Sequence, residues 1–247
     1  MPLDYSAKIV YTESCVAQHR PLTNSKPMTK KTPFSSIFLL LLPFVVHAQE
    51  RTLFEEPFDV KLKDGWAWLR EVSGDWRIRD KALEIKMEPM PEGNRVRNIL
   101  YRKPPKKDEG PFTVSVEVNV LQPYSNQFQQ AGLYWMQGEE LRYKFVMERI
   151  DGELFVFPGK VPMESEHVVL RWRIDDTKII SEFQPKGTGE FRKAHEHELP
   201  NRNDETDRLA LQCRHGPANA ESWTQFKNFN ITRPETRLEQ GTPSRNP

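Results

Sequence analysis

The chain has 247 residues, a formal net charge of +1 at pH 7 and a hydrophobic content of 37%, with 11% aromatic residues. This balance is typical of a globular protein and excludes an intrinsically disordered or collagen-like chain. Of the 36 Lys and Arg residues, five lie in the first 48 positions, and the remainder of the chain is close to neutral. It therefore lacks the excess of basic residues that binding to nucleic acid phosphates requires.

The first predicted element is a secretory signal. An apolar run at positions 37–46 follows the pair Lys30-Lys31 and precedes the small-residue cleavage site Val46-His47-Ala48. A membrane-spanning helix is the alternative, but it needs about 20 apolar residues, whereas this run is about half as long and contains Pro43. We therefore predict a secreted or periplasmic protein without a membrane span after cleavage. Translation is predicted to begin at Met28, so that residues 1–27 are a mis-called N-terminal extension. Residues 28–48 are the predicted signal peptide.

The cysteine count bears on how the exported domain is stabilised. The two cysteines are Cys15, which lies before the predicted cleavage site, and Cys213. Cys213 would then have no intramolecular partner, so the domain must be stabilised by its core rather than by a disulfide. Its place in the run with Leu209 and Leu211 predicts a buried, unpaired thiol.

From Leu53 to Thr232 the sequence alternates short β-type runs with turn-forming clusters, and it shows no long helical period. Residues 114–120 and 167–174 alternate apolar and polar positions, as strands with one face on a core do. Further strands are predicted at 54–58, 66–70, 76–79, 83–87, 99–102, 129–136, 143–148, 154–157, 179–185, 208–214 and 225–232.

About a dozen strands exceed the number in an immunoglobulin-type sandwich. We therefore predict an all-β fold, a two-sheet antiparallel jelly-roll sandwich, in one domain at residues 49–232. Residues 233–247 are polar and contain proline, and a disordered tail is expected there.

Several short segments of the sequence, in this order along the chain, resemble those of a known protein family. They are Asp64–Glu71 (DGWAWLRE), Trp76–Asp80 (WRIRD), Leu83–Ile85 (LEI), Gln130–Trp135 (QAGLYW), Val169–Trp172 (VLRW), His215–Pro217 (HGP) and Phe226–Phe229 (FKNF). The set resembles the concanavalin A-like lectin/glucanase superfamily, and within it the secreted bacterial domain labelled "regulation of enolase protein 1"-like. The resemblance covers about residues 53–232. It implies a sandwich with one concave face, related to carbohydrate-binding and accessory domains of glycosidases, and the label names no reaction.

Two sequence patterns bear on catalysis and metal binding: the acidic motif of glucanases and the run His195–Glu198. Glucanases of this superfamily place acidic residues at alternating positions of one strand, and no such motif occurs here; Glu148 and Asp151 are three residues apart and flank a turn. His195 and His197 would share one face of a strand, but zinc takes three or four ligands, and a polar edge strand is the commoner explanation of this run. We predict neither a catalytic residue, nor a metal site, nor a cofactor.

The remaining candidates are polar residues that lie, by strand phase, opposite apolar ones. They define a predicted ligand-binding surface on one concave sheet: Gln130, Tyr134, Lys144, Glu148, Arg171 and Gln212. The alternative is a merely solvated sheet face. On either interpretation the face is not core, so truncation of Tyr134 or Arg171 is expected to leave folding intact.

Together these observations predict an exported non-catalytic carbohydrate-binding or accessory domain whose partner is a glycan or a cell-surface polymer. One alternative is a glycoside-acting enzyme with an atypical site, in which Glu148 is the best available carboxylate. The other is a protein–protein interaction module, which would be marked by a large exposed apolar patch.

Overall fold

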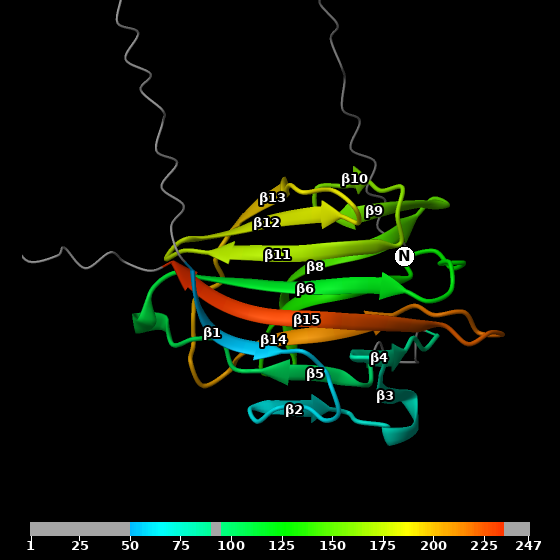
Figure 1. The fold of residues 1–247 in the computed structure, drawn as a ribbon, viewed down its shortest axis with the longest axis horizontal. Helices are drawn as coiled ribbons and strands as arrows, with labels where there is room; N and C mark the ends of the chain where they lie inside the picture. The colour runs from blue at the N-terminus through cyan, green and yellow to red at the C-terminus, as the bar shows by residue number, and fades with distance from the viewer. Residues whose placement is uncertain (1–49, 90–94, 235–247) are drawn as a thin grey trace, which may run out of the picture. The chain divides into compact units, whose positions relative to one another are not determined.

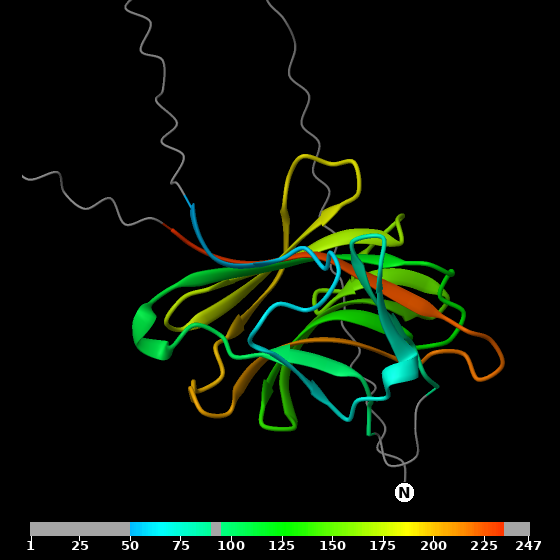
Figure 2. The same ribbon diagram turned by 60° about the horizontal axis from the view of Figure 1, so that its bottom comes forward.

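The computed structural model describes residues 50–89 and 95–234. Within these ranges fifteen strands form two antiparallel sheets, and no α-helix occurs. The predicted all-β, two-sheet sandwich is thereby confirmed. Figures 1 and 2 show the two sheets lying one over the other. The predicted extension, signal peptide and cleavage site lie outside the described residues, as do positions 235–247 of the predicted tail.

The first sheet, sheet A, has eight strands. Its strands run in the order β13 (Arg192–Glu198), β12 (Lys178–Pro185), β11 (His167–Ile174), β6 (Phe112–Val120), β15 (Trp223–Pro234), β4 (Ala82–Lys86) and β3 (Trp76–Arg79), and β1 (Glu50–Glu56) also pairs with β15. β15 extends two residues into the segment expected to be tail, so Arg233 and Pro234 belong to the sheet.

The second sheet, sheet B, has seven strands. Their order is β10 (Val161–Pro162), β9 (Glu153–Phe157), β8 (Glu140–Ile150), β7 (Gln130–Gln137), β14 (Asp207–Arg214), β5 (Ile99–Arg102) and β2 (Trp66–Leu69). Two short 3-10 turns, η1 (Ser73–Asp75) and η3 (Lys107–Glu109), complete the described elements. β10 is not among the strands predicted from sequence, and β13 includes the run predicted as a polar edge strand.

The main core lies between the sheets and follows from period-two alternation. β6 alternates buried and half-buried residues along its whole length, because its apolar side chains face sheet B. Trp135 of β7 and Trp172 of β11 meet in this core, with ring centroids 6.5 Å apart and both side chains fully buried. Each such side chain contributes roughly 1.5 to 3 kcal/mol or more to folding through the apolar area it buries.

Cys213 belongs to this core, as predicted. It is the free cysteine of the described residues and only 4% exposed. Burial raises the pKa of its thiol well above the ordinary value, so the reactive thiolate is suppressed at neutral pH.

The His195–Glu198 run forms part of β13, which lies at the edge of sheet A. The ring of His197 stacks on Tyr143 of β8 at a centroid distance of 4.6 Å. Across residues 50–89 and 95–234, no group of three or more His, Cys, Asp or Glu side chains is arranged as metal ligands. The same residues contain no helix long and apolar enough to cross a membrane.

Candidate functional site

The outer face of sheet B, turned away from the main core, carries most of the predicted ligand-binding residues. On β7 the side chains of Leu133 and Trp135 lie in the main core, whereas Tyr134 and Met136 belong to a separate apolar cluster. Strand alternation therefore places Gln130 and Tyr134 on the outer face, as their phase relative to Leu133 predicted.

Strand register brings residues distant in sequence together on this face. Gln130 of β7 is directly opposite Glu148 of β8 on one side and Arg214 of β14 on the other. Gly132, two residues after Gln130 on β7, is opposite Gln212 of β14. Tyr134, the next outward residue of β7, is opposite Lys144 of β8. Five of the six predicted residues, Gln130, Tyr134, Lys144, Glu148 and Gln212, thus occupy three adjacent strands of one sheet face.

Four of these residues form a closed hydrogen-bond network, called the polar cluster below: Gln130, Tyr134, Lys144 and Glu148. The Gln130 amide nitrogen donates to Glu148 Oε1 (2.8 Å) and to the carbonyl of Phe128 (3.0 Å). The Gln130 amide oxygen accepts from Tyr134 OH (3.2 Å) and from Lys144 Nζ (2.8 Å). Lys144 Nζ also donates to Glu148 Oε2 (3.0 Å). The Gln130 amide therefore uses both donors and both acceptor positions, which fixes its orientation.

Gly132 lies between Gln130 and Tyr134 on β7, where β8 and the core approach its backbone closely. Its φ is +159°, and a Cβ on this backbone would lie 2.4 Å from the carbonyl oxygen of Phe145 and 2.8 Å from Leu170 Cδ1. No other residue fits this conformation without movement of the neighbouring strand. Because Tyr134 OH bonds to Gln130 four residues earlier on the same face, the phenol ring passes over Gly132.

Three residues of the polar cluster are buried and Lys144 is partly exposed, and this corrects one prediction from the sequence. Tyr134 is fully buried, and it packs in a second apolar cluster with Val96, Ile99, Val146 and Ala210. The expectation that truncating Tyr134 would open no cavity is therefore wrong. Strand phase separated the two faces of β7, but it could not show that the outer face has apolar packing of its own.

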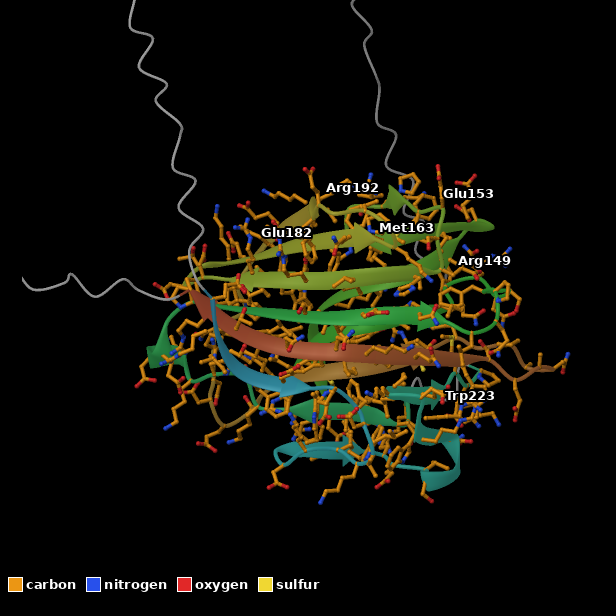
Figure 3. All side chains as sticks on the ribbon, viewed as in Figure 1. Arg149, Glu153, Met163, Glu182, Arg192 and Trp223 are labelled. Carbon is orange, nitrogen blue, oxygen red and sulfur yellow. The ribbon has the colours of Figure 1, made fainter. Side chains whose placement is uncertain are left out.

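Arg171 does not belong to this site. It lies on β11 in sheet A, where its guanidinium binds Glu182 of β12 at 2.7 Å and stands over the ring of Phe191, 3.5 Å from the centroid. Figure 3 shows Glu182 on sheet A. Phase along a single strand gives the face of a residue but not the sheet to which its strand belongs, and for this reason the prediction that Arg171 joins the other five is wrong.

Three residues that the prediction left out border the polar cluster: Phe128, Arg214 and His215. Phe128 is 47% exposed, and its ring contacts that of His215 edge to face with centroids 6.4 Å apart. Both residues have a left-handed backbone, with φ of +62° and +65°. Such conformations are costly for bulky residues and concentrate at functional sites. Sequence phase could have included Arg214, two residues after Gln212, but it gives no sign of a left-handed aromatic residue.

Burial and positive charge together shape the electrostatics of the site. Burial lowers the pKa of Lys144, and the positive charge of Arg214 acts in the same direction against the opposing effect of Glu148. The pKa of His215 is lowered by burial and by Arg214 and Lys144, so its imidazole is neutral at pH 7. Burial also raises the pKa of Tyr134, which keeps its hydroxyl protonated.

Glu148 is poorly placed for hydrolysis by a carboxylate pair. Both of its oxygens accept hydrogen bonds, from Gln130 and Lys144, and the residues opposite it on the neighbouring strands are Gln130 and Phe155. Glycosidases need a second acid within about 5 to 10 Å of the first, with one of the two free to protonate or to attack. The network is instead closed on itself, so its polar groups are held in fixed positions.

A hollow region lies beside the β7–β8 hairpin, at residues distinct from the polar cluster. Two depressions of about 480 and 610 Å³ share Arg142, Pro200 and Asn201 in their walls. The loop that forms them is fixed by a buried ion pair between Arg202 and Asp207, 2.8 Å apart. None of the six predicted residues lines either depression.

Comparison with known proteins gives a likeness of fold. No protein-family model matches the chain, and no curated protein matches it. Solved structures with a similar fold include a GH43B protein of the Bacteroides ovatus xyloglucan locus (14% identity, TM-score 0.57) and a xylan β-1,4-xylosidase from Bacillus halodurans C-125 (14%, 0.53). Each match covers 72% of this chain, and 38% and 39% of those chains respectively.

A third structure of similar fold is the GH43 protein BlXynB from Bacillus licheniformis, at 16% identity and a TM-score of 0.54, with the same 72% and 38% coverage. The chain thus spans well under half the length of these structures. At such identities the likeness concerns the fold alone. The resemblances to the concanavalin A-like superfamily and to its "regulation of enolase protein 1"-like domain stay predictions.

Proposed function

We propose that this protein is an exported, non-catalytic carbohydrate-binding or accessory domain, and that its ligand binds on the outer face of sheet B. The observation that carries the proposal is the polar cluster beside the exposed ring of Phe128. Carbohydrate ligands offer many hydroxyl groups around a ring with flat apolar faces. A binding site for them combines oriented polar side chains with aromatic surface.

The free energy needed to bury the charges of the polar cluster supports a functional role. The Lys144–Glu148 pair is largely buried, with side-chain exposures of 19% and 5%. A buried ion pair often stabilises a fold no better than apolar residues of similar volume, because both charges must be desolvated. The surrounding face already has an apolar cluster into which such residues would fit. Ligand recognition gives a reason for retaining the charges.

The edge of the site supports the same conclusion. The Phe128 carbonyl accepts from Gln130, and its amide donates to the Arg149 carbonyl at 2.8 Å, so the network holds the loop that presents the ring. Phe128 is therefore a fixed rather than a freely moving aromatic residue. The solved structures of similar fold include proteins named as xylosidase and as a xyloglucan-locus GH43 protein, and this supports carbohydrate as the ligand class.

Glycan-array binding with the full chain tests the proposal. Phe128→Ala should weaken retention on the bound glycan by roughly tenfold, since it removes a contact worth about 1 to 2 kcal/mol. Leu141→Ala is the matched control, because Leu141 is similarly exposed (41%) but carries no part of the network. It should bind like the wild type. Absence of binding to any glycan, or equal loss in both variants, would refute the proposal.

A further inference from the structure

Arg214 is a cation without an ion-pair partner at the border of the polar cluster. Its side chain projects from β14 on the outer face, opposite Gln130. Among the described residues it forms no side-chain hydrogen bond and no ion pair, and its Nε is buried without a partner. Two other strand arginines differ in this respect: Arg77 is paired with Glu84 and Arg171 with Glu182.

Arg102 is a second arginine with buried nitrogens that have no hydrogen-bond partner, and its position has a structural explanation. Its guanidinium lies 3.1 Å from the centroid of the Phe54 ring and 5.3 Å from that of Trp66, so stacking accounts for its position. No aromatic ring of the described residues stands under Arg214 in this way. The buried Nε of Arg214 is therefore left without a partner among the described residues.

The local charge balance favours an anion. Glu148 is the carboxylate of the polar cluster, and it is already neutralised by Lys144 at 3.0 Å. Arg214 itself forms no ion pair with a described residue, so its positive charge has no described counterpart. A buried N–H group without a partner costs about 1 to 3 kcal/mol, and an anion with two acceptor oxygens would satisfy the guanidinium fork in bidentate fashion.

From this arrangement we infer that the ligand is an acidic glycan and that Arg214 binds the carboxylate of one of its uronate residues. The inference rests on the proposed function and specifies its ligand class. The accessible residues Phe128 and Lys144 hold the sugar ring, and the guanidinium of Arg214 pairs with the carboxylate that a neutral sugar lacks. Arg is better suited than Lys to this contact because its planar fork matches the two carboxylate oxygens.

The test compares polysaccharides that differ only in the carboxylate. Polygalacturonate, alginate and glucuronoxylan are each presented beside a carboxyl-reduced form, in which every carboxylate is replaced by a hydroxymethyl group. We expect the full chain to bind at least one acidic form roughly tenfold or more tightly than its reduced form, since a charged hydrogen-bonded pair is worth about 1.5 to 3 kcal/mol.

Variants of Arg214 assign the effect to this residue. Arg214→Gln should remove the preference for the acidic form while keeping the residual affinity for the reduced form, and Arg214→Lys should restore only part of it. Arg208→Gln is the matched control on the same strand and face; Arg208 stands over the Tyr101 ring, outside the polar cluster. It should keep the full preference. Thermal unfolding of each variant, expected to match the wild type, separates lost binding from lost folding.

The outcomes distinguish the two proposals. Equal binding of acidic and reduced forms, or the same loss in the Arg208 and Arg214 variants, would overturn the uronate inference and leave carbohydrate binding in place. Binding only to neutral glycans on the array would do the same. If no glycan of either kind is bound, the proposed function falls together with the inference.

Discussion

Tyr134 shows that the face of a residue and its burial are separate questions. Its phase on β7 places it on the outer face of sheet B, yet its side chain is fully buried against Val146 and Ala210. Its hydroxyl is tied to Gln130. Tyr134 therefore contributes to stability as well as to the geometry of the polar cluster.

A paired set of substitutions separates these contributions. Tyr134→Phe removes only the hydrogen bond and should lower the free energy of unfolding by about 0.5 to 1.5 kcal/mol. Tyr134→Ala also leaves a cavity and should cost about 3 to 5 kcal/mol. Arg171→Ala should cost about 1 kcal/mol or less, because Glu182 keeps its contact with Arg173 at 3.1 Å. Urea denaturation measures all three. Equal losses for Tyr134→Ala and Arg171→Ala would contradict the assigned burial.

At the scale of elements, β7 depends on Gly132 to let β8 approach. A Cβ at Gly132 would meet backbone atoms of Phe145 and Val146, which cannot rotate away as a side chain can. We expect Gly132→Ala to lower the free energy of unfolding by about 2 kcal/mol or more. It should also weaken glycan binding, because Tyr134 and Gln130 flank the distorted position.

The control for this substitution is Gly74→Ala. Gly74 lies in η1, and a Cβ there would have no atom within 4 Å. Its expected effect on the thermal midpoint and on binding is close to zero. If Gly132→Ala were as harmless as Gly74→Ala, the close approach of β7 and β8 would not be as described.

The strands themselves were largely predictable from sequence, and the reason is physical. Alternation in 114–120 reflects a strand with one face on the core, and β6 shows that pattern at every position. β13 was foreseen only as a possible polar edge strand, because an edge strand buries few residues and leaves little periodic signal. Pairing between distant strands, such as β7 with β14, has no local sequence signature.

Because strand pairing has no local sequence signature, only part of the candidate site could be predicted from sequence. Phase selected Gln130, Tyr134, Lys144, Glu148 and Gln212 correctly as outward-facing residues of their strands. It also selected Arg171, because nothing in a single strand shows which sheet the strand joins. The left-handed backbones of Phe128 and His215 depend on how their loops close over the sheet.

At the scale of the whole molecule, the sandwich offers two outer sheet faces and the depressions beside the β7–β8 hairpin as places for a ligand. The two outer faces differ in how far their charges are neutralised. On sheet A, Glu182 is paired with Arg171 and Arg173. On sheet B the polar cluster is closed internally and Arg214 has no described partner. The central claim is therefore that the ligand occupies the outer face of sheet B.

Hydrogen exchange of the full chain, with and without a glycan that it retains, tests this claim most directly. The account predicts slower exchange on binding in the segments that carry the site, namely residues 126–130, 144–149 and 212–217. Exchange in β11 and β12 of sheet A, and in the loop at 199–206, should stay unchanged. Protection confined to sheet A or to that loop, with the three segments of sheet B unaffected, would contradict the account.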